Sequence, residues 1–183
     1  MLRFQPLNLF DLSTKDKNLS DFDFSKCPSG KGFKIHIAIS DWNEKVTSSL
    51  LEGAVAALDK LGVSHDDVEI LHTPGAFELP VAAKSLLKNR NSDAVICLGC
   101  VIKGDTQHDE YINNSVATGL SQLSILSGKP IIFGLLTVNN LEQALERSGG
   151  KHGNKGIEAA VTAVKMADAL KKLSSPKGTI GFI

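Results

Sequence analysis

The sequence has no net charge and no long apolar run. Lysine plus arginine number 20, as do aspartate plus glutamate, among 183 residues. A protein that binds nucleic acid through its overall charge needs surplus positive charge. We therefore expect no nucleic-acid partner, with a local basic patch as the remaining alternative. A transmembrane helix needs about 20 consecutive apolar residues, and none is present, so we expect no membrane partner.

Cysteine is also scarce. Cys27, Cys97 and Cys100 are too few, and odd in number, for a disulfide framework. We therefore expect a reducing, cytoplasmic location. The first residues lack the continuous apolar stretch of a signal peptide, and the four aspartates among residues 1–31 argue against a transit peptide.

Two short motifs resemble metal sites but lack the geometry of one. Cys97 and Cys100 form C-x-x-C at the end of an expected strand, where side chains three apart point to opposite faces. The run His108-Asp109-Glu110 has no correctly spaced histidine after it, and adjacent residues do not share a face. We expect neither a metal nor a cofactor.

Hydrophobic patterning predicts one domain with a leader and a tail. The polar, aperiodic residues 1–31 are interpreted as a leader outside the core, 32–173 as an α/β domain, and 174–183 as a tail. The tail ends in apolar residues, which favours docking on its own or a neighbouring subunit; a disordered tail is the alternative.

Within the domain, apolar runs alternate with helical periodicity. The expected strands cover 35–40, about 67–72, 94–99 and 131–136, and the expected helices contain 46–61, about 77–89, 112–126, about 140–148 and about 156–173. This alternation predicts βαβ units with right-handed crossovers and a mainly parallel sheet covered on both faces. Such sheets bind ligands beyond the carboxyl ends of their strands.

Aromatic and acidic residues follow the first two expected strands. Trp42 could stack on a planar ligand or pack against its own helix. Phe77 is by default a core residue, and Glu78 could simply complement a helix dipole. The functional alternative is that the segment containing Phe77 and Glu78 forms a small lid, whose N–H groups and one carboxylate bind a polar heterocycle.

The segments after the third and fourth strands carry candidate phosphate ligands. Lys103, Thr106 and His108 offer a cation, a hydroxyl and an imidazole before a helix, where phosphate commonly binds; a capped surface loop is the alternative. Arg147 could complement a helix dipole or clamp a phosphate. The glycine-rich run after it is not a P-loop, because no Ser or Thr follows Lys155.

Five motifs together resemble one family, the lumazine synthases of riboflavin synthesis. They are Trp42-Asn43 and the segments 74–80, 99–108, 133–137 and 142–156, in the family's order. The resemblance implies a flavodoxin-like, three-layer α/β/α sandwich around a mainly parallel four-stranded sheet. It also implies pentamers with active sites between neighbouring subunits.

The implied reaction condenses 5-amino-6-(D-ribitylamino)uracil with 3,4-dihydroxy-2-butanone 4-phosphate to 6,7-dimethyl-8-ribityllumazine, with release of phosphate and water. Its partners would be these two small-molecule substrates and other copies of the chain, with riboflavin synthase as an open further partner. A non-catalytic flavin or lumazine carrier and a flavodoxin-type electron carrier remain alternatives. Retention of both His108 and Arg147 disfavours a carrier, which needs neither proton transfer nor a phosphate grip.

The resemblance also implies the site residues, with His108 as the proton-transfer group. The pyrimidine and its ribityl chain would be bound by Trp42, Ala76, Phe77, Glu78, Cys100, Val101 and Ile102, with Phe133 from the adjacent subunit. The phosphate would be bound by Asp105, Thr106 and the adjacent subunit's Arg147, with Lys103 and Lys155 as further candidates. Two positions depart from the common family pattern, since Asp105 adds a negative side chain and Lys103 replaces a frequent arginine.

Overall fold

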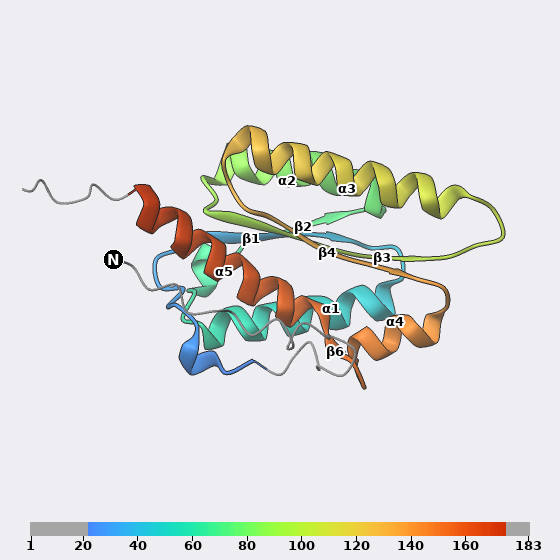
Figure 1. Cartoon of the computed structure of the whole chain (residues 1–183), viewed down its shortest axis with the longest axis horizontal. Coiled ribbons are helices and arrows are strands. Elements are labelled where there is room, and N and C mark those ends of the chain that lie inside the picture. The colour runs from blue at the N-terminus through green and yellow to red at the C-terminus, as the bar shows by residue number, and fades with distance from the viewer. Residues whose placement is uncertain (1–21, 175–183) are drawn as a thin grey trace, which may run out of the picture.

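The computed structural model describes residues 22–174, and at its centre is a four-stranded sheet (Figure 1). The strands are β1 (Ile35–Ser40), β2 (Ile70–Thr73), β3 (Ala94–Ile102) and β4 (Ile131–Val138). They pair in the order β2-β1-β3-β4, and every pair is parallel. This confirms the predicted parallel sheet, and the order matches the first four strands of the flavodoxin-type arrangement.

Five helices cover the two faces of this sheet. In Figure 1, α1 (Glu44–Lys60), α4 (Leu141–Arg147) and α5 (Lys155–Ser174) lie below the sheet, whereas α2 (Leu79–Arg90) and α3 (His108–Ser127) lie above it. The molecule therefore has the predicted three layers. Within the described residues, no helix is long and apolar enough to cross a membrane.

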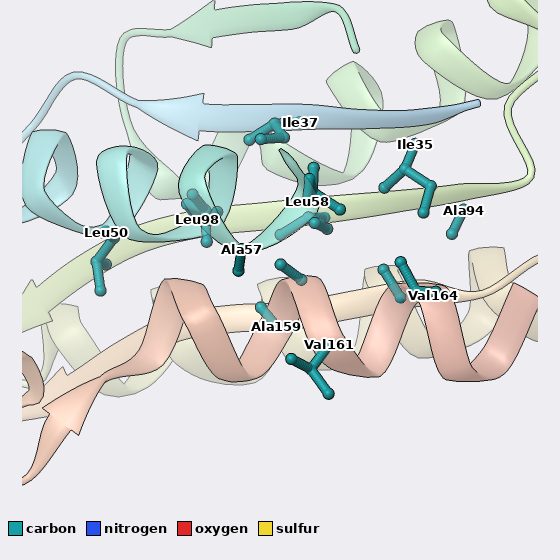
Figure 2. Close-up of a cluster of buried hydrophobic side chains, with 14 of the residues drawn as sticks. Ile35, Ile37, Leu50, Ala57, Leu58, Ala94, Leu98, Ala159, Val161 and Val164 are labelled. Atoms are coloured by element: carbon teal, nitrogen blue, oxygen red, sulfur yellow. The ribbon is translucent and has the colours of Figure 1, made fainter. Parts of the chain in front are cut away.

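The main core lies between the sheet and the α1–α5 pair (Figure 2). Ile35 and Ile37 of β1, Leu58 of α1 and Val164 of α5 meet there, and each is at most 1% exposed. A second cluster on the opposite face joins α2 and α3 to the sheet. Burying one such aliphatic side chain contributes about 1.5–3 kcal/mol, so the two clusters account for the largely apolar composition of the central strands.

Three expected strand boundaries are wrong, and one of them is the end of β4, which continues from residue 136 to Val138. β3 was expected to end at residue 99 but continues to Ile102, because its last residues pair with Thr137 and Val138 of β4. β2 begins only at Ile70, since His65–Asp67 forms a short 3-10 helix instead of strand.

A hairpin replaces the loop expected after α4. Its strands, β5 (Ser148–Gly150) and β6 (Gly153–Asn154), pair antiparallel. Gly149 and Gly153 have φ values of 130° and 82°, a region that side chains disfavour. Strands of two and three residues are too short to show an alternating pattern, so the sequence reading missed them.

The expectation that the leader lies wholly outside the core is wrong for residues 22–31. Phe22, Phe24 and Cys27 pack against the main core, and the N–H of Gly30 donates to Leu61 O at 2.7 Å. A domain boundary near residue 31 stays a prediction. Residues 1–21 and the tail after Ser174, with its expected docking, lie outside the described residues.

The close crossing of α1 and α5 yields a stability prediction. A Cβ at Gly156 would lie 1.9 Å from the backbone oxygen of Leu50, and backbone cannot swing aside as a side chain can. We expect Gly156→Ala to lower the free energy of unfolding in urea by about 3 kcal/mol, the upper part of the range for overpacking. Gly104→Ala is the control, because its Cβ would meet nothing within 4 Å. Equal stability of the two variants would contradict this packing.

Candidate active site

A cavity of about 420 Å³ lies beyond the carboxyl ends of β1 and β3. Its walls come from the β1–α1 turn, the 3-10 helix η5 (Ala76–Glu78), the end of β3 and the start of α3. It is lined by most of the expected site residues, namely Trp42, Ala76, Phe77, Glu78, Cys100, Val101, Ile102, Thr106 and His108. Segments far apart in the sequence therefore meet where the parallel sheet predicted.

Two exposed aromatic rings stand at this cavity. Trp42 is 72% exposed and Phe77 is 60% exposed. The alternative in which Phe77 is a core residue is thus wrong, and Trp42 is not buried against its own helix. Large exposed aromatic side chains beside an apolar cavity provide stacking surfaces for a planar ligand.

Asn43 fixes the turn that carries Trp42. Its backbone is left-handed, with φ 63° and ψ 43°, a conformation that asparagine tolerates better than most residues. Its side-chain Nδ2 donates to Cys100 O at 2.9 Å, which ties the turn to β3. Asn43 lines the cavity but was not singled out as a site residue; an asparagine at a strand-to-helix turn was the available signal.

The turn before η5 is held by Thr73. Its hydroxyl donates to Ile39 O at 3.1 Å and lies 2.9 Å from Gly75 O, so the segment is pinned to β1. Pro80 then occupies the first turn of α2, as expected, where its missing N–H costs nothing. These local restraints place Phe77 and Glu78 at the cavity.

The first turn of α3 forms the other wall. His108 is the first helical residue, and its backbone N–H donates to the Thr106 hydroxyl at 3.4 Å. A helix N-terminus favours anions, so this wall has the character expected of a phosphate site. Asp105 and Lys103 lie exposed in the same loop but do not line the cavity.

Three expected site residues lie elsewhere. Arg147 is exposed at the end of α4, and Phe133 faces a hollow at the outer edge of β4 and α3. Lys155 Nζ pairs with Glu158 Oε1 at 2.6 Å on α5. Within a single chain, the structure therefore does not bring these side chains to the cavity.

The cavity combines an apolar floor with two carboxylates, Glu78 and Asp109. None of the described lysines or arginines lines it. On the floor, burial raises the pKa of Cys100 to about 11. Burial also raises the pKa of Cys97, which lies in the core cluster on the other face of β3. The placement of these two thiols confirms the prediction that they point to opposite faces of the strand.

Sequence reasoning missed several lining residues besides Asn43: Gly75, Gly104, Asp109 and Ile112. Gly75 and Gly104 belong to motifs that were recognised. Asp109 was considered only as part of an apparent metal cluster. No group of three or more potential metal-ligating His, Cys, Asp or Glu side chains occurs within residues 22–174.

Comparisons with known proteins agree on one family. A family model described as 6,7-dimethyl-8-ribityllumazine synthase matches residues 32–171. The protein of that name from Porphyromonas gingivalis is 48% identical over 156 residues, which cover 85% of this chain and 97% of the relative. The one from Parabacteroides distasonis is 43% identical over 157 residues, covering 86% and 98%. The one from Cytophaga hutchinsonii is 46% identical over 155 residues, covering 85% and 97%.

The buried thiols give a prediction about reactivity. Because the thiolate is the reactive form, a thiol with a pKa near 11 is about one-thousandth ionised at pH 8. We expect Ellman's reagent at pH 8 to modify the part-exposed Cys27 quickly, and Cys97 and Cys100 only after denaturation. Cys27→Ser should remove the fast phase. A fast phase that persists in this variant would show that the cavity floor is more open or more polar than described.

Proposed function

The chain belongs to the 6,7-dimethyl-8-ribityllumazine synthase family, and we propose that the cavity beyond β1 and β3 is where its reaction takes place. That reaction, in riboflavin biosynthesis, condenses 5-amino-6-(D-ribitylamino)uracil with 3,4-dihydroxy-2-butanone 4-phosphate to the lumazine, with release of phosphate and water. The observation that carries the proposal is the meeting of two stacking rings, a carboxylate and a helix N-terminus around one cavity.

The aromatic side of the cavity suits the pyrimidine. Trp42 and Phe77 offer rings to stack on it, worth about 0.5–1.5 kcal/mol per ring pair beyond the buried area. The pyrimidine and its ribityl chain carry several N–H and O–H donors, and Glu78 supplies an acceptor for them. Ala76, Cys100, Val101 and Ile102 complete its binding surface.

The start of α3 suits the phosphate of the second substrate. Asp105 and Thr106 would present backbone N–H groups and the threonine hydroxyl, and Lys103 would add positive charge nearby. The cavity nevertheless lacks lysine and arginine among the residues described. We propose that a neighbouring copy supplies Arg147 and Phe133, with Lys155 as a further candidate, in an assembly built on pentamers. The exposed position of Arg147, away from its own cavity, supports this arrangement.

His108 is the proposed proton-transfer residue. The amine of the pyrimidine attacks the ketone, water leaves to form an imine, phosphate is eliminated and the ring closes. His108 can accept the proton that the amine loses on attack and return one to the departing water. Holding the two substrates side by side supplies much of the remaining rate enhancement. We further propose that the enzyme works in the cytoplasm, where riboflavin synthase would consume the product.

The first test of this site is the removal of the imidazole. We expect His108→Ala to slow lumazine formation, followed by absorbance, by about 10–10³-fold, the range for one proton-transfer group. Some activity should remain, because orientation and phosphate binding are untouched. His65→Ala is the control, since His65 is exposed on a different segment of the chain and outside the cavity. Wild-type turnover by His108→Ala across pH 5–9 would leave His108 without an essential proton-transfer role.

The second test addresses the phosphate clamp. We expect Arg147→Ala to raise the KM for the butanone phosphate while sparing the pyrimidine, and Arg147→Lys to recover only part of the loss, because an ammonium cannot make a planar two-pronged contact. Arg90→Ala is the control, since Arg90 pairs with Glu69 outside the cavity.

Mixed assemblies test whether Arg147 acts across subunits. When Arg147→Ala and His108→Ala chains are co-expressed in equal amounts, about a quarter of the sites between neighbouring subunits should pair an intact His108 with an intact Arg147. Activity should then exceed the average of the two variants. If the activity of the mixed assemblies equals the average of the two variants, Arg147 acts in the site of its own chain or takes no part in the reaction.

A further inference from the structure

Asp109 has an unusual position in the cavity wall. It is the second residue of α3 and lines the cavity, yet its Oδ1 atom is buried and has no donor within hydrogen-bond distance among residues 22–174. A buried acceptor without a partner is costly, above all on an acidic side chain. Such an acceptor in a native protein calls for an explanation, and a role in binding a ligand is one.

The helix dipole does not explain this placement by itself. A carboxylate in the first turn of a helix is favourable, but Glu110 in the same turn obtains that benefit while exposed to solvent. Asn113, one turn later, also has a buried Oδ1 without a donor among the described residues, but it does not line the cavity. Asp109 therefore combines a buried acceptor, unpaired within residues 22–174, with a place in the cavity wall.

We propose that Asp109 is a further substrate-binding residue, whose carboxylate turns toward the cavity and accepts a hydrogen bond from an N–H or O–H group of the pyrimidine substrate. The butanone phosphate is a poorer partner, because its phosphate carries nearly two negative charges, which the Asp109 carboxylate repels. The pyrimidine is uncharged and rich in donors. This inference rests on the proposed placement of the pyrimidine in the cavity.

Two groups of the pyrimidine substrate could supply the donor, and they predict different kinetics. If the reacting 5-amino group donates, Asp109 orients the nucleophile beside His108, and its loss lowers kcat. If a ribityl hydroxyl donates, Asp109 only holds the substrate, and its loss raises KM with kcat unchanged. In both cases the loss of Asp109 lowers kcat/KM for the pyrimidine, and this quantity therefore tests the proposal.

The experiment compares Asp109→Ala, Asp109→Asn and Glu110→Ala in steady-state assays with each substrate varied in turn. We expect Asp109→Ala to lower kcat/KM for the pyrimidine by about tenfold or more, the loss typical of a hydrogen bond to a charged group. Asp109→Asn should recover part of this loss, because its amide oxygen still accepts. Glu110→Ala removes the same charge from the same turn and should stay within about twofold of wild type, so it corrects for the helix dipole.

Thermal unfolding and light scattering of the ligand-free variants separate binding from structure. We expect Asp109→Asn to keep the wild-type melting temperature and assembly size, because its Oδ1 has no partner to lose among residues 22–174. If Asp109→Ala has the same kcat/KM for the pyrimidine as Glu110→Ala, the proposal is overturned. So would a loss of assembly size in Asp109→Asn, which would give Asp109 a partner in a neighbouring subunit instead.

A Trp42→Ala variant distinguishes this failure from failure of the proposed site. If Trp42→Ala raises the KM for the pyrimidine while both Asp109 variants bind normally, only the role of Asp109 is wrong. If Trp42→Ala also leaves pyrimidine binding unchanged, the placement of the pyrimidine in this cavity is wrong, and the inference falls with it. If Asp109→Ala does not fold, the Asp109→Asn comparison with Glu110→Ala decides alone.

Discussion

Both faces of the central strands β1 and β3 are buried under helices, and this burial determines where the side chains of the proposed site can lie. A polar side chain on either face loses its water and must find a partner inside the protein, as His36 does by accepting from the Glu69 N–H at 2.9 Å. Groups that meet a ligand therefore lie past the strand ends, in the segments that lead into helices. Trp42 and Glu78 lie in such segments and His108 is the first residue of the helix after one, and because the strands are parallel these segments gather at one edge of the sheet.

The same packing explains why one chain carries only part of the proposed site. The cavity contains stacking rings and acceptors, whereas the cation proposed for the phosphate lies at the end of α4. The position of that helix end depends on the β5–β6 hairpin, which is bonded to α1: the Ser49 hydroxyl donates to Ser148 O, and Asn154 Nδ2 donates to Ser49 O. The hairpin thereby holds the end of α4, where Arg147 is exposed.

The turns around the cavity are held by side-chain-to-backbone hydrogen bonds. Asn43 Nδ2 ties the left-handed turn to Cys100 O, and the Thr73 hydroxyl ties the next turn to Ile39 O. This leaves Phe77 and Glu78 available for a ligand. The unpaired oxygen of Asp109 is the extreme case, since the fold supplies a buried acceptor and no donor for it among the described residues. Binding energy can then be gained where the free protein has an unsatisfied group.

Much of this architecture was determined by the sequence alone. The apolar runs of β1 and β3 and the helical spacing from Val46 to Leu58 depend on local periodicity, which reports directly whether a segment is buried on one side or both. The family resemblance also named most of the residues that the structure brings together around one cavity. Its division of roles among them stays a prediction.

Other features were decided only by tertiary structure, because they depend on partners distant in the sequence. β3 extends to Ile102 because β4 pairs with it, and the β5–β6 hairpin forms against α1. The exposure of Phe77 cannot be read from its hydrophobicity, which by itself favours the core. Whether Asp109 has a donor likewise depends on which atoms the folded chain brings to within hydrogen-bond distance, a property that no local pattern of residue types contains.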